Sequence, residues 1–167
     1  MIYLGIGSNL PSQAFGAPIS NCRAAIAGLT RAGLAPAAIS PFYETAPVPV
    51  SDQPWYVNCV VGVAETALSP QAALATCLAV EAELGRVRSV RNAARTADID
   101  LLDWHGRIID EAPDLILPHT RMAERAFVLL PLAVIAPDWH HPVTGRGIAE
   151  LIADLPAGQQ IRPSQAR

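Results

Sequence analysis

The stretch from Gly85 to Trp104 constrains the fold more than any other part of the chain. In its second half, polar and apolar side chains alternate. Asp98 and Asp100 fall on one side of this pattern. Ile99 and Leu101 fall on the other. Because successive side chains of a β-strand point to opposite faces, the alternation predicts a strand that is buried on one face and carries both carboxylates on the other.

This pair of aspartates needs a positive partner. Two carboxylates on one strand face repel each other by roughly 3 kcal/mol at an effective dielectric near 20, and Asp is a poor strand former. Either divalent metal ions or the arginines just upstream could offset this repulsion. These arginines are Arg86, Arg88, Arg91 and Arg95. Oxygen ligands favour Mg²⁺, and arginines beside them suggest a polyphosphate. The alternative is a half-exposed strand whose aspartates face water.

Composition narrows the classes of function. The chain has 167 residues, of which 51% are hydrophobic and 16% charged, so we expect a globular domain with a real core. A net charge of −3 argues against broad, non-specific nucleic-acid binding. All twelve basic residues are arginines, which excludes Schiff-base lysine chemistry and a P-loop lysine. A phosphate site in this chain must therefore use arginine, backbone amides or metal.

The cysteines and the apolar runs indicate the compartment. Cys22, Cys59 and Cys77 are odd in number, widely spaced and set among apolar neighbours, which predicts buried thiols in a reducing environment. The N-terminal stretch has no basic region typical of a signal peptide. The apolar run at 126–137 is too short to span a bilayer. We expect a cytoplasmic protein with no membrane partner.

The predicted elements alternate in type along the chain. In order they are a strand at 2–7, a helix at 20–33, an extended segment at 34–48, a strand at 55–65, a helix at 69–85 and the strand that begins at 98. This order predicts an α+β fold with a ferredoxin-like βαββαβ core, an antiparallel sheet with helices packed on it. Apolar spacing adds a C-terminal helical extension. We expect a single domain over residues 1–155 and a loose tail over 156–167.

Two polar residues occupy places where apolar ones are expected. Glu81 lies on the apolar stripe of the second helix, three residues after Leu78, and a carboxylate there is costly unless it is paired. Either a nearby arginine neutralises Glu81 or it faces a site, and the arginine-rich loop that follows favours the site. Asn58 interrupts an apolar strand and needs a partner. A core hydrogen bond and a ligand contact remain equally open for it.

Six stretches, in order, resemble the 6-hydroxymethyl-7,8-dihydropterin pyrophosphokinase family, and the resemblance runs from about Ile2 to Leu155. They are IGSN, SPFYETAP, DQPWYVN, LGRVR, RTADIDLL and LPHTRMAERAFVLLPL. The resemblance implies transfer of a pyrophosphoryl group from ATP to the hydroxymethyl oxygen of a pterin in folate biosynthesis, with AMP as leaving group. It implies two Mg²⁺ ions and small-molecule substrates, with no nucleic-acid partner. We expect a monomer.

The resemblance also implies roles for residues on the nucleotide side. Asp98 and Asp100 match the metal ligands, and Arg86 and Arg95 match catalytic arginines that clamp the phosphates and assist the transfer. The implied nucleotide contacts are Glu81, Arg86, Arg88, Arg95, Leu101, His119, Thr120 and Arg125.

On the pterin side, the resemblance implies a pocket in which Asn58 reads the edge of the pterin by paired hydrogen bonds. The rings of Tyr56 and Phe127 would sandwich the face of the pterin. The full set of implied pterin contacts is Gly7, Thr45, Ala46, Pro47, Val48, Tyr56, Asn58 and Phe127.

The sequence departs from the family pattern on the nucleotide side. Asn92 and Ala94 stand where a tryptophan and a proline are usual, and Leu78 stands where glutamine is common. These departures motivate one alternative to the active enzyme, a pterin-binding paralogue with altered or lost nucleotide use. A further alternative, a small-molecule-sensing domain with no link to pterins, leaves the arginine cluster and the aspartate pair unexplained.

Overall fold

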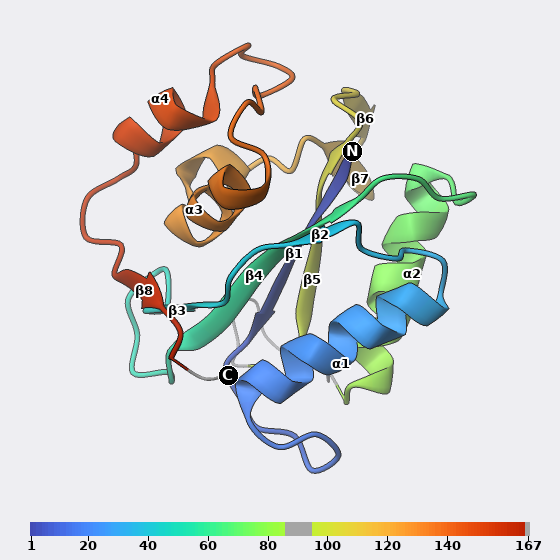
Figure 1. Ribbon diagram of the computed structural model, residues 1–167, viewed down its shortest axis with the longest axis vertical. Coiled ribbons are helices and arrows are strands. Elements are labelled where there is room, and N and C mark those ends of the chain that lie inside the picture. The colour runs from blue at the N-terminus through green and yellow to red at the C-terminus, as the bar shows by residue number, and fades with distance from the viewer. Residues whose placement is uncertain (86–94, 166–167) are drawn as a thin grey trace.

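An antiparallel sheet forms the centre of the computed structural model, which describes residues 1–85 and 95–165 (Figure 1). Its strand order is β5-β1-β4-β3-β8, and β2 also pairs with β4. The strands are β1 (Ile2–Ser8), β2 (Ala38–Ile39), β3 (Tyr43–Thr45), β4 (Tyr56–Val63), β5 (Asp98–Trp104) and β8 (Ile161–Pro163). The α+β prediction is confirmed, and the order β5-β1-β4-β3 is consistent with a ferredoxin-like core.

Helices α1 (Pro18–Arg31) and α2 (Pro70–Glu83) cover one face of the sheet. Ser69 caps α2, because its hydroxyl accepts the N–H of Ala72 at 3.2 Å, and Pro70 follows at the first helical position. The core on this side joins both helices to the apolar face of β1, β4 and β5. All three cysteines are free and buried there, as predicted. No helix among the described residues is long and apolar enough to cross a membrane.

The C-terminal helices cover the opposite face of the sheet. A 3-10 turn, η1 (Met122–Glu124), leads into α3 (Ala126–Ile135), and α4 (Ile148–Ala153) packs beside α3. A second apolar cluster lies between these helices and the sheet. The C-terminal helical extension is therefore one layer of the fold, on the face of the sheet opposite α1 and α2.

The prediction of a loose tail is wrong for the residues that follow α4. Ile161–Pro163 forms β8, which pairs antiparallel with β3. The main chain adds a bond from the N–H of Ala46 to the carbonyl of Gln160, 3.0 Å long. A three-residue strand of Ile, Arg and Pro is too short to show an apolar alternation of its own, so only the pairing with β3 defines it.

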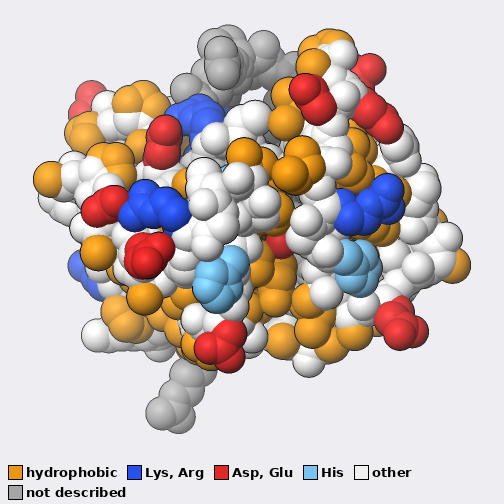
Figure 2. Space-filling view, turned by 90° about the horizontal axis from the view of Figure 1, so that it is seen from above, with side chains coloured by type: hydrophobic (Ala, Val, Ile, Leu, Met, Phe, Trp, Pro, Cys, Tyr) orange, Lys and Arg blue, Asp and Glu red, His pale blue; other side chains and the backbone are white. Residues whose placement is uncertain are grey.

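The segment at 109–117 forms a second small sheet. Strands β6 (Ile109–Glu111) and β7 (Leu115–Leu117) pair with each other and not with β5. Leu115 and Leu117 are buried in the first core. Figure 2 shows the end of the molecule that carries α4 and this small sheet, where the acidic, basic and apolar side chains of the described residues are interspersed.

Candidate active site

Three neighbouring strands bring the central residues of the site side by side. Gly7 on β1 pairs with Asn58 on β4 and with Asp98 on β5, and Gly5 pairs with Asp100. Residues that pair across an antiparallel sheet point to the same face. One amide and two carboxylates therefore share the face that α3 covers, and the two glycines leave the floor between them without side chains.

Asn58 explains why position 7 is a glycine. A Cβ atom at Gly7 would lie 2.7 Å from the Asn58 Oδ1, closer than real contacts allow. The Asn58 Nδ2 donates to the hydroxyl of Thr45 at 2.6 Å, and both side chains are buried. Asn58 thus makes a core hydrogen bond and also lines a pocket, and its contact with a ligand stays a prediction.

The smaller of the two main pockets at this site has a volume of about 240 Å³ and opens beside Asn58. Seven of its lining residues are predicted pterin contacts, namely Thr45, Ala46, Pro47, Val48, Tyr56, Asn58 and Phe127. The eighth predicted contact, Gly7, lines an adjoining recess together with Asn58, Asp98 and Phe127. The structure therefore brings the whole predicted set together, from β1, β3, the β3–β4 connection, β4 and α3.

A larger pocket, of about 640 Å³, lies between α2, β5 and the β6–β7 sheet. Five predicted nucleotide contacts line it: Glu81, Arg95, Leu101, His119 and Thr120. The smaller and larger pockets share Arg95, Asp98 and Asp100. The aspartate pair therefore stands where the two pockets meet, and we call this place the junction.

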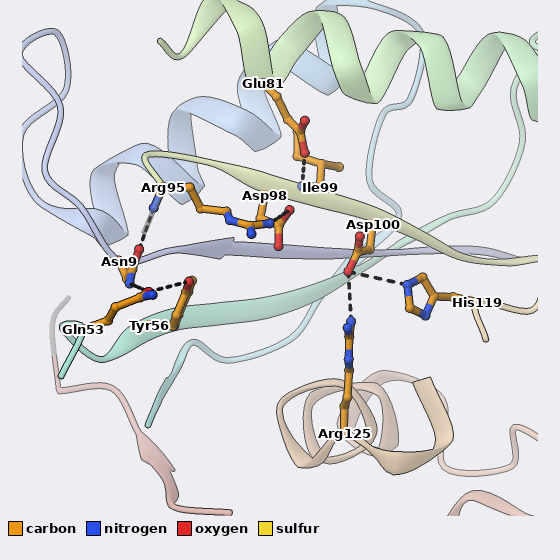
Figure 3. A network of polar contacts seen from close by, with 10 residues as sticks. All are labelled: Asn9, Gln53, Tyr56, Glu81, Arg95, Asp98, Ile99, Asp100, His119 and Arg125. Carbon is orange, nitrogen blue, oxygen red and sulfur yellow. Dashed lines mark hydrogen bonds and ion pairs between the residues drawn. The ribbon is translucent and has the colours of Figure 1, made fainter. Parts of the chain in front are cut away.

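Opposite charges surround the aspartates at the junction (Figure 3). Arg95 donates to Asp98 at 2.7 Å, and Arg125 donates to Asp100 at 3.2 Å. Burial raises the pKa of Asp100 and the charge of Asp98 raises it further, although His119, 4.0 Å away, and the two arginines act in the opposite direction. Because the pKa of Asp100 stays raised, the nearby cations offset only part of the combined effect of burial and the Asp98 charge, and an added cation would be favourable.

Burial also sets the state of His119. It lowers the pKa of the imidazole, and the nearby charge of Arg125 lowers it as well, against the opposing effect of Asp100. The His119 Nδ1 accepts the N–H of Arg121 at 3.1 Å, which directs Nε2 toward Asp100. A neutral imidazole in this orientation can donate one hydrogen bond from Nε2 into the junction.

Glu81 supports the strand that carries the aspartates. Its Oε1 accepts the N–H of Ile99 at 2.7 Å, and only 2% of the residue is exposed (Figure 3). Because β5 is an edge strand, this carboxylate supplies a partner that no neighbouring strand provides. Glu81 lines the larger pocket, as a site-facing residue should, but this hydrogen bond holds β5 between Asp98 and Asp100. Direct contact of Glu81 with a nucleotide stays a prediction.

The sequence matches the family model of 7,8-dihydro-6-hydroxymethylpterin-pyrophosphokinase (HPPK) over residues 3–137. The chain belongs to the HPPK family. It is 41% identical over 158 residues to a 2-amino-4-hydroxy-6-hydroxymethyldihydropteridine pyrophosphokinase of Methylorubrum extorquens, which covers 93% of this chain and 94% of the relative. An enzyme of the same name from Pseudomonas aeruginosa is 39% identical over 156 residues, with 93% and 91% covered.

A solved structure shares the fold. A crystal structure of HPPK-DHPS in complex with substrates matches 91% of this chain and 42% of that longer chain, with a TM-score of 0.66 and 15% identity. At this identity the likeness shows the HPPK fold alone.

Asn9 is a residue of this HPPK site that sequence reasoning missed. Its Oδ1 accepts the N–H of Arg95 at 2.8 Å, and its Nδ2 donates to Gln53 and to the Pro54 carbonyl, both at 3.2 Å (Figure 3). Gln53 in turn accepts the Tyr56 hydroxyl at 3.3 Å. The buried amide therefore links an arginine at the junction to the wall of the smaller pocket. Its signal was an asparagine at the end of the IGSN stretch.

Three further predicted nucleotide contacts are the arginines Arg86, Arg88 and Arg125. Arg86 and Arg88, together with Asn92 and Ala94, lie outside the described residues. Arg125, predicted as a nucleotide contact, lines the smaller pocket and pairs with Asp100, so its place is the junction and not the larger pocket.

The donor set at the junction fits Mg²⁺. The described residues contain no group of three His, Cys, Asp or Glu side chains that could hold a metal ion by themselves. Two carboxylates with arginines nearby instead suit an ion that keeps water ligands and completes its shell with substrate phosphates. The raised pKa of Asp100 agrees with a place where an added cation lowers the energy of the ionised pair.

Proposed function

We propose that this enzyme transfers pyrophosphate from ATP to 6-hydroxymethyl-7,8-dihydropterin and releases AMP, as a monomer acting in cytoplasmic folate biosynthesis. The observation that carries the proposal is the meeting of two pockets at Asp98 and Asp100. A group transfer requires two substrates whose reacting atoms come together at one place, where the charge of the transferred group is offset.

The smaller pocket suits the flat, polar acceptor. The amide of Asn58 offers one donor and one acceptor at the edge of a pterin, and buried polar groups of this kind reject molecules that leave them unpaired. The rings of Tyr56 and Phe127 offer apolar faces for stacking. The hydroxymethyl group of a pterin held this way would point toward the junction.

The larger pocket suits the nucleoside of ATP. Its apolar lining includes Leu74, Leu78, Leu115 and Ile116, against which a base can pack. The phosphate chain would reach the junction, where Arg95 and His119 can donate hydrogen bonds to its oxygens. Phosphate oxygens would compete there with Asp98 for the same guanidinium group.

Asp98 and Asp100 would hold the two Mg²⁺ ions, which when bound supply charge neutralisation for the triphosphate. In the transfer, the hydroxymethyl oxygen bonds to the β-phosphorus, the bond from that phosphorus to the AMP oxygen breaks, and the hydroxyl proton is released. Arg95 and Arg125 hold the carboxylates in place before the substrates arrive. The side chains orient the two substrates and offset charge, which is most of what a phosphoryl-type transfer asks of a protein.

The test is a product assay with purified protein, the pterin alcohol, ATP and Mg²⁺. We expect AMP and the pterin diphosphate in equal amounts, and we expect Asp98→Asn and Asp100→Asn to abolish both products. Asp110→Asn is the matched control, because Asp110 is an exposed aspartate on β6 that lines neither pocket. AMP formation that survives both junction substitutions would contradict the metal assignment. Pterin binding without AMP formation by the unmodified protein would favour the paralogue.

A further inference from the structure

The residues after α4 support the N-terminus of α3. The Gln159 Oε1 accepts the N–H of Ala126 at 2.9 Å, and its Nε2 donates to the carbonyl of Glu124, also at 2.9 Å. Arg125, at the N-cap position of α3, provides no capping side chain. A helix N-terminus has N–H groups without intrahelical partners, so this glutamine completes the cap from 33 residues away. Ala126 lies between Arg125 and Phe127, both of which line the smaller pocket.

The same segment also holds the loop on the opposite wall of the smaller pocket. The Gln160 carbonyl accepts the N–H of Ala46, at the start of the loop. At the end of the loop, the guanidinium of Arg162 lies 4.7 Å from the centre of the Trp55 ring. Arg162 also pairs with Glu44 on β3 at 2.7 Å. Residues 159–163, which we call the strap, are therefore attached to the 46–55 loop at both ends.

The strap bridges a gap between these two walls. A recess of about 260 Å³ separates residues 46–50 from residues 121–125, and residues 156–160 form its third side. Adjacent strap residues contact the two walls, Gln159 at α3 and Gln160 at the loop. The spacing between Phe127 and the loop residues Pro47 and Val48 thus depends on two neighbouring positions in the strap.

We propose that Gln159 is a positioning residue for the pterin substrate, acting through the strap. By fixing the first turn of α3 against the 46–55 loop, it sets the width of the smaller pocket in which the pterin would stack on Phe127. The identity of the ligand rests on the proposed function, whereas the mechanical link between strap, loop and helix does not.

Gln159→Leu removes both hydrogen bonds at similar side-chain size. We expect the KM for the pterin to rise roughly five- to tenfold while the KM for ATP stays within about twofold, because misplacement of one wall weakens binding on that side alone. Gln159→Glu keeps an acceptor for the Ala126 N–H, favourable at a helix N-terminus, but loses the donor to the Glu124 carbonyl, so it should bring the pterin KM to a value between those of Gln159→Leu and the unmodified enzyme. Gln160→Leu is the matched control, because the main-chain bond to Ala46 survives it.

Hydrogen exchange of the ligand-free proteins gives a readout that needs no activity. Gln159→Leu should speed exchange in peptides that cover residues 46–54 and 126–130, and leave β1 unchanged. A uniform increase that includes β1 would assign Gln159 a general role in stability and overturn the proposal. Unchanged exchange, or an equal rise in both KM values, would also overturn it. Absence of AMP from the unmodified protein would refute the proposed function, while the exchange pattern would still decide on the strap.

Discussion

The smaller and the larger pocket share Asp98 and Asp100 but differ in how their walls are held. In the smaller pocket, hydrogen bonds between the lining side chains orient the polar groups, as between Asn58 and Thr45 at 2.6 Å and between Tyr56 and Gln53 at 3.3 Å. The larger pocket has an apolar wall on α2 and β7, formed by Leu74, Leu78, Leu115 and Ile116. Oriented, buried polar groups discriminate strongly, whereas an apolar wall tolerates changes in its ligand. The comparison teaches that selection should be strict for the pterin and looser for the base of the nucleotide.

The junction should show the largest effect, since it serves both pockets. We expect Asp98→Asn to lower kcat by about a thousandfold or more, because charge stabilisation at a transferred phosphoryl group is lost. Chelation of Mg²⁺ should have an equal effect on the unmodified enzyme, reversed when Mg²⁺ is returned. Initial rates of AMP formation measure both. A substitution that raised only one KM and spared kcat would mean that the junction belongs to one pocket.

Gly7→Ala should affect the smaller pocket alone. The new methyl group would meet the Asn58 Oδ1 at 2.7 Å and push the amide away from its place. We expect kcat/KM for the pterin to fall by about ten- to a hundredfold while the KM for ATP changes by less than about threefold. Gly5→Ala is the control on the same strand, because its methyl group would make only ordinary contacts with Leu102 at 3.5 Å. Equal losses from the two substitutions would show that backbone strain in β1 is the cause.

Leu78→Ala probes the tolerance of the larger pocket. Leu78 is partly exposed on α2 and lines that pocket. Loss of part of an apolar wall should raise the KM for ATP by only about two- to fivefold and leave the KM for the pterin unchanged. Steady-state kinetics with ATP varied at saturating pterin measures this. A loss as large as that of Gly7→Ala would remove the contrast between the two pockets.

The smallest effect that we expect is on stability. When no metal is bound, the ionised Asp100 carboxylate at the junction disfavours the folded state. Burial and Asp98 raise the pKa of Asp100, so the ionised form costs stability once the pH rises through that raised pKa. Below the ordinary pKa of about 4 the carboxyl is protonated in both states and the cost vanishes. With chelator present, Asp100→Asn should melt roughly 2–4 °C higher than the unmodified protein at pH 7. This difference should shrink toward pH 4 in thermal unfolding. A lower melting temperature at pH 7 would contradict the charge argument.

The sequence predicts what local patterns encode. Alternation of Asp98 and Asp100 with apolar neighbours predicted β5, and the helix predicted at 69–85 corresponds to α2. Resemblance to the HPPK family supplied the residues that line the smaller pocket, and the structure brings them together.

Contacts between distant segments could not be read from the sequence. Asn9 reaches Arg95 across 86 positions, and Gln159 reaches Ala126 across 33. A single polar side chain in a turn or tail leaves no periodic signal, because its partner is chosen by the packing of other elements. The same reason explains why β8 was expected to be loose: its strand is defined by the edge of β3 and not by its own side chains.

The most direct test of the account is a crystal structure with Mg²⁺, a non-hydrolysable ATP analogue and the pterin bound together. We predict the pterin in the smaller pocket against Asn58, the nucleoside in the larger pocket near Leu78, and the phosphate chain with its metal ions at Asp98 and Asp100. A pterin in the larger pocket, or a phosphate chain that bypasses the aspartate pair, would contradict the claim that the two pockets meet there to carry out the transfer.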